Sequence, residues 1–308
     1  MKVNNQIINQ LIEHSVFTAN QLAIEYHYPD NLTHLLYLMI PAFILKYGME
    51  NECYILDSFR SIPIIIEDKQ DMVNQAFYQS VPYLQGDHYL TYKMIVLKNY
   101  HNIGLMQLLD NLVHEFNHAI NSMKQELKVL DHKVYVRTGL TSIIYDSKFF
   151  RVVGKEDNSI LEEIINTKQT EMIIDIIHSF YQYDIQNREV VTTLFSIHNL
   201  ISGSYRSNAY LLQSLVCQTL MNNKTFISTL EKLRFQGDID DIGAWFDQIT
   251  GKEGSYCQLV SLLQKTFSLQ LDLLKQTGIK IFKVRKIKML NQEAMAIVDL
   301  FDRNCNYR

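Results

Sequence analysis

The sequence predicts an α+β protein in which a mixed N-terminal region is followed by a mainly helical C-terminal region. All four prolines fall within the first 82 residues, among short apolar runs of strand length. Residues 134–153 alternate and are rich in β-branched and aromatic side chains, a pattern typical of strands joined by turns. After residue 185, apolar residues recur with helical spacing between breaks of Gly, Asn and Asp.

The first hundred residues predict an opening helix and then strands. Apolar runs at 35–45, 53–56 and 62–66 have strand length, and 92–97 predicts a further strand, buried or at an edge, that leads into a long helix over 101–124. We therefore expect an α+β region over 1–100, a central region over 101–185 and a helical subdomain over 186–308. The central region holds the long helix, a β-hairpin and a second long helix that begins near Ser159.

Composition limits the classes of partner. The formal net charge of −4 gives no reason to expect nucleic acid as a partner. The longest apolar run, 35–45, contains Pro41 and is too short to span a bilayer, so we expect no membrane partner. Four scattered cysteines without a C-x-x-C pair, and a start that lacks a secretory pattern, predict a cytoplasmic protein with reduced thiols.

A short basic run extends from Lys280 to Lys288. Its charges alternate with apolar residues, which predicts a strand or helix with one solvated face.

The strongest chemical signal is the motif His114-Glu115-Phe116-Asn117-His118, an H-E-x-x-H inside the predicted helix 101–124. Residues four apart lie on one side of a helix, so both imidazoles can bind one metal ion while Glu115 reaches a water beside it. The motif predicts a zinc hydrolase.

The helix also has an apolar stripe, and the two histidines do not lie on it. Turning about 100° per residue aligns Leu105, Leu109, Leu112, Phe116, Ile120 and Met123. His114 and His118 project from the opposite side, with Asp110, Asn111 and Asn121. The alternative interpretation is a solvated polar face that carries two surface histidines.

A third metal ligand is expected, because catalytic zinc usually has three protein ligands and one open position. Two adjacent glutamates compete for this role. Glu162 lies three residues after Ser159 and forms a capping box, whose loss would cost about 1 kcal/mol. Glu163 projects away from the stripe of Leu161 and Ile165, so it is the better ligand candidate.

These features resemble the gluzincins, zinc metallopeptidases in which one helix carries H-E-x-x-H and a later helix supplies a glutamate. The resemblance covers about residues 93 to 180, and 161–170 are similar to the L-x-E-G-x-T-E-x-x-T pattern of bacterial members. It implies a zincin-like fold with 101–185 as its core, and Zn²⁺ held by His114, His118 and Glu163. It also implies hydrolysis of a peptide or protein substrate by a zinc-activated water, with Glu115 as general base.

Two positions depart from the family pattern. Gluzincins usually have Asp or Glu four residues after the ligand glutamate, where this chain has Thr167, and a glycine where it has Ile164. The alternative function is therefore a catalytically inactive, zincin-fold protein that binds metal or a protein partner.

An oxyanion donor besides the metal is also expected, commonly a Tyr hydroxyl or a His. The segment 202–210 offers Tyr205 and Tyr210, and His178 and His198 are further candidates. Arg137, in the predicted hairpin, is either a solvated side chain or a contact for a substrate carboxylate.

Overall fold

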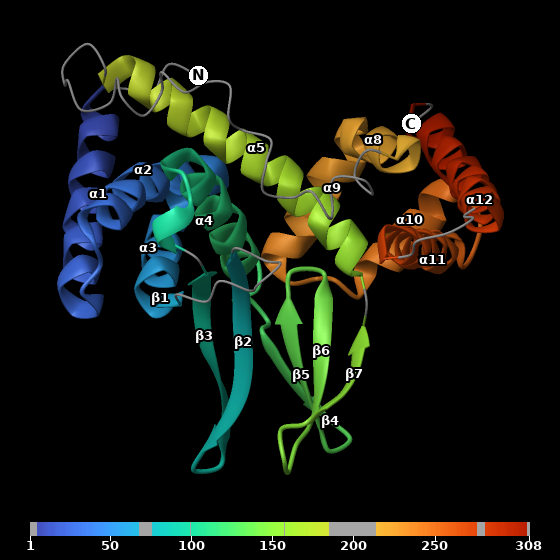
Figure 1. The fold of residues 1–308 in the computed structure, drawn as a ribbon, viewed down its shortest axis with the longest axis horizontal. Coiled ribbons are helices and arrows are strands. Elements are labelled where there is room, and N and C mark those ends of the chain that lie inside the picture. The colour runs from blue at the N-terminus through green and yellow to red at the C-terminus, as the bar shows by residue number, and fades with distance from the viewer. Residues whose placement is uncertain are drawn as a thin grey trace. The chain divides into compact units, whose positions relative to one another are not determined.

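The computed structural model describes residues 5–67, 76–98, 100–156, 158–184, 214–275 and 281–306 (Figure 1). The chain divides into two compact units. Unit 1 is Met1–Met123 with Gln169–Ser204, and unit 2 is Lys124–Lys168 with Tyr205–Arg308. The division falls inside one continuous helix, α5 (Ser159–Asp184), so this helix contributes residues to both units.

Unit 1 begins with three α-helices, α1 (Asn5–Tyr26), α2 (Asp30–Tyr47) and α3 (Glu52–Ser61), with the 3₁₀ turn η1 (Met49–Asn51) before α3. The opening helix is confirmed. The strands expected at 35–45 and 53–56 are wrong, because these residues lie in α2 and α3. The run 35–45 is buried on nearly all sides and the run 53–56 is only four residues long, so neither shows a periodicity that separates strand from helix. Pro41 lies inside α2 and did not prevent the helix.

A three-stranded sheet follows in unit 1. β1 (Ile64–Glu67), β2 (Ala76–Gln85) and β3 (His88–Lys98) lie in the order β1-β3-β2, with β1 parallel and β2 antiparallel to β3. The expected strands at 62–66 and 92–97 are confirmed. Because β3 is paired on both sides, β2 is an edge strand and β3 is not. β3 leads through η2 (Tyr100–Asn102) into α4 (Leu105–Ile120), the expected long helix.

Unit 2 contains an antiparallel sheet of four strands in sequence order. They are β4 (Leu127–Leu130), β5 (Lys133–Thr138), β6 (Thr141–Asp146) and β7 (Val152–Glu156). The hairpin expected in this segment is confirmed, with Gly139 and Leu140 as the two-residue turn between β5 and β6. Gly139 has a φ of 60°, which a turn of this length favours and glycine adopts readily.

The described residues of unit 2 from 214 onward are mainly helical, as the sequence predicts. Its helices are α8 (Leu215–Asn222), α9 (Lys224–Gln236), α10 (Asp241–Thr250), α11 (Ser255–Lys275) and α12 (Ile281–Asn306). Phe226, Phe246 and Phe301 lie at the centre of their core, with the Phe246 and Phe301 rings stacked at 4.7 Å. The α+β class with a helical C-terminal region is therefore confirmed.

Two further sequence features have a structural counterpart. All four cysteines are free, and burial raises the pKa of the Cys217 thiol to about 11. Among the described residues, no single helix is long and apolar enough to cross a membrane. The bent pair Asp30–Tyr47 and Met49–Ser61 reaches that length and composition only when its two parts are taken together.

Candidate metal centre

Helix α4 carries the H-E-x-x-H motif and is buried on nearly all sides along its second half. Its apolar stripe packs into the core of unit 1, where Phe116 stacks on Phe59 of α3 at 4.3 Å. The opposite, polar side is buried as well, because His114 and His118 are only 2% and 6% exposed. The interpretation of these residues as surface histidines is therefore wrong.

Buried amides and hydroxyls cover this polar side of α4 within unit 1. Asn117 accepts a hydrogen bond from the Tyr47 hydroxyl of α2 and donates to Gln169 of α5 at 3.1 Å. Asn121 donates to both Tyr47 and Asn117. Asn117, Asn121 and Gln169 are all fully buried. We call Tyr47, Asn117, Asn121 and Gln169 the amide network. It holds α5 against the side of α4 from which the histidines project.

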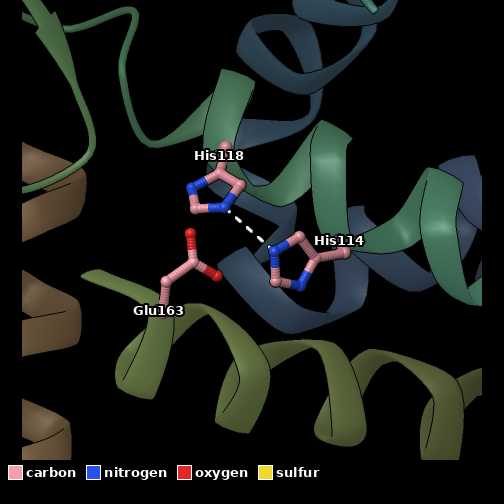
Figure 2. A group of neighbouring side chains, drawn as sticks. All are labelled: His114, His118 and Glu163. Carbon is pink, nitrogen blue, oxygen red and sulfur yellow. Dashed lines mark hydrogen bonds between the residues drawn. The ribbon is translucent and has the colours of Figure 1, made fainter. Parts of the chain in front are cut away.

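His114, His118 and Glu163 form the candidate metal centre, and Figure 2 shows their side chains pointing toward one another from α4 and α5. The Nε2 atoms of the two imidazoles are 3.0 Å apart. One ligand atom of each residue lies within 4.8 Å of the other two. The three residues chosen from the sequence thus have side chains that lie close together in the structure.

The spacing fits a metal ion. Two donors bonded to one zinc ion at about 2.0–2.1 Å and a tetrahedral angle are about 3.3 Å apart. The imidazole nitrogens are already near that separation, and the carboxylate needs a shift of about 1.5 Å at most. Two imidazoles and one carboxylate are a donor set of catalytic zinc, although they also suit Fe(II).

Glu115 lies beside the first histidine, and its carboxylate is oriented by the sheet of unit 1. Its Oε2 accepts a hydrogen bond from the Tyr78 backbone amide of β2 at 2.7 Å. This amide points to Glu115 and not to β3, as expected for an edge strand. Glu115 is only 6% exposed, so its carboxylate lies where there is little solvent.

Glu162, the neighbour of Glu163, has a larger structural role than the expected helix cap. In unit 2 its carboxylate forms a buried ion pair with Arg234 of α9 and accepts a hydrogen bond from the Leu140 amide. A Cβ atom at Gly139 would lie 2.1 Å from this carboxylate, so only glycine fits there. The first turns of α5 are thereby tied to α9 and to the β5–β6 turn.

Arg137 has a structural role that neither sequence interpretation anticipated. It is buried, and its guanidinium donates to the backbone carbonyls of Lys124, Gly139 and Arg234. It is therefore neither a solvated hairpin side chain nor exposed for a substrate carboxylate.

The structure also shows the surroundings of Ile164 and Thr167, the two positions that depart from the gluzincin pattern. Ile164 is fully buried in the core cluster of unit 2, where a glycine would leave a cavity. The Thr167 hydroxyl is buried without a hydrogen-bond partner among the described residues. The position where gluzincins have an acid therefore contributes no hydrogen bond to the histidines.

The expected oxyanion donors Tyr205 and Tyr210 lie outside the described residues, as does His198. The sequence analysis missed the amide network and Arg234. Asn117 lies between the two histidines and shares a side of α4 with Asn121, which was a signal for polar contacts. No local pattern marks Tyr47 or Arg234, because their partners are distant in sequence.

Comparisons of this chain with protein-family models, with curated proteins and with solved structures each found no match.

Proposed function

We propose that this protein is a zinc-dependent metallopeptidase with a zincin-like fold, acting on a peptide or protein substrate. The observation that carries the proposal is the convergence of two buried imidazoles of one helix and a carboxylate of another, with Glu115 next to the first imidazole. This donor set, together with a glutamate that is not a ligand, is what hydrolysis at zinc requires.

The residues have distinct roles in this proposal. His114, His118 and Glu163 hold the metal, and a bound zinc ion supplies Lewis acidity that polarises a carbonyl and lowers the pKa of water. Glu115 is the general base and then the general acid. Its Oε2 is held by the Tyr78 amide, so the proton is taken up and returned at Oε1. Burial keeps bulk water away from the transferred proton.

Metal analysis of the purified protein, combined with peptidase assays, tests the proposal. Wild type should contain one zinc ion per chain and cleave a peptide library. Glu115→Gln should keep the metal and lose at least about a hundredfold in kcat, the usual contribution of a general base. Glu163→Ala should lose both metal and activity. Stoichiometric iron in place of zinc, or full activity of Glu115→Gln, would contradict the proposal.

The second candidate is a metal-binding or protein-interaction protein without catalysis. It is favoured by the unpartnered Thr167 hydroxyl, because the loss of a hydrogen bond to a ligand histidine commonly costs tenfold to a hundredfold in metal affinity or activity. Zinc at full occupancy with no cleavage by wild type would support this candidate over the peptidase.

A further inference from the structure

Helix α12 contains an exposed apolar and basic segment that the proposed function does not use. The sequence predicts an element with one solvated face over the run from Lys280 to Lys288, and residues from 281 onward are indeed helical. The solvated face is not purely polar. Phe282 is 83% exposed, and Val284 and Met289 are more than half exposed.

The two parts of α12 differ in burial. From Ala294 to Phe301 the helix places Ala294, Val298 and Phe301 in the core of unit 2, against α10 and α11 (Figure 1). Over 282–289 the helix continues, but among the described residues no apolar side chain covers its outward side. Phe282 and Met289 are seven residues apart and therefore lie within about 20° of each other on that side. We call 282–289 the docking segment.

Cations surround these apolar side chains. Arg285, Lys286 and Lys288 are exposed, whereas Lys283 faces α11 and pairs with Asp272 at 3.1 Å. No acidic residue occurs from 281 to 292, in a chain whose net charge is −4. The local positive charge is therefore a property of this segment and not of the protein as a whole.

We propose that the docking segment binds the surface of an anionic lipid bilayer, which departs from the sequence-based expectation of no membrane partner. Such a surface offers negative headgroups to the cations and, a few ångströms deeper, hydrocarbon to Phe282 and Met289. A second copy of the chain does not fit, because symmetric pairing through this side places cations against cations. Nucleic acid would satisfy the cations and leave Met289 without an apolar partner.

Co-sedimentation of the full chain with vesicles tests this proposal. The protein should bind vesicles of phosphatidylcholine with phosphatidylserine, and bind vesicles of phosphatidylcholine alone far more weakly. Each cation near an anionic surface contributes about fivefold. Replacing Arg285, Lys286 and Lys288 by Gln should thus weaken binding about a hundredfold. Added salt should also weaken binding by wild type.

Matched variants distinguish vesicle binding through the docking segment from nonspecific adsorption of exposed apolar side chains. Phe282→Ser with Met289→Ser should weaken vesicle binding at least tenfold. Phe149→Ser, which removes another exposed phenylalanine, 63% exposed in the loop between β6 and β7, should leave it unchanged. Circular dichroism should show that each variant retains the fold.

Three outcomes would overturn the proposal: no binding to the anionic vesicles, equal binding to both kinds of vesicle, or equal loss in the Phe149→Ser variant. If the chain binds soluble polyglutamate and not the vesicles, its partner is an acidic protein and the lipid proposal is wrong.

Discussion

In most helices polar side chains are exposed and apolar side chains are buried, and α4 and α12 each depart from this rule in a different way. α4 buries polar side chains, including both histidines, Asn117 and Asn121, whereas the first turns of α12 expose Phe282 and Met289. Asn117 of α4 has hydrogen-bond partners on α2 and α5, and Asn121 has one on α2. A buried polar group without a partner is costly, so such a network is built only where it is needed. Exposed apolar side chains cost the folded state little and add little to its stability.

The largest expected effect concerns the buried polar groups of α5. Glu162→Ala should lower the free energy of unfolding by about 3–5 kcal/mol, because it leaves the fully buried Arg234 without its ion-pair partner. Asp175→Ala, at an exposed position on the same helix, should change it by less than about 0.5 kcal/mol. Urea titration measures both. A loss near 1 kcal/mol for Glu162→Ala would mean that it acts only as a helix cap.

A smaller effect is expected from the amide network on α4. Asn117→Leu removes the hydrogen-bond partner of Gln169 and Tyr47 and should cost about 1–3 kcal/mol. Asn222→Leu, at an exposed asparagine at the end of α8, is the matched control and should be nearly neutral. Equal stability of the two variants in thermal unfolding would show that the network does not hold α4 and α5 together.

The smallest effect is expected on the exposed side of α12. Phe282→Ser should leave the unfolding free energy within about 0.5 kcal/mol of wild type. Phe301→Ser, on the same helix but in the core, should cost about 3–5 kcal/mol. Urea titration of the pair separates a surface that serves binding from one that serves folding. A large loss of unfolding free energy in Phe282→Ser would show that this side chain stabilises the fold, so the contrast between buried polar groups in α4 and free apolar groups in α12 would not hold.

Local sequence patterns predicted most of the helices, the hairpin of unit 2 and the three side chains that lie together in the candidate metal centre. Spacing of four residues fixes the relation of His114 to His118 in any helix, and the period of α5 separates Glu163 from Leu161. The strands expected in α2 and α3 were wrong, because nearly uniform burial removes the periodicity of 35–45 and the four-residue run 53–56 is too short to show one. The ion pair of Glu162 with Arg234 joins residues far apart in the chain, so no local pattern could reveal it.

The hydrogen bond between Glu115 and the Tyr78 amide has a consequence for the order of events at the site. A single N–H group makes one good hydrogen bond, and the Tyr78 N–H lies on the free edge of β2. A polypeptide that extends the sheet past Tyr78 would compete for that donor and release Oε2. Occupancy of that edge would then decide whether Oε2 of Glu115 is held by the sheet or left free to accept another hydrogen bond.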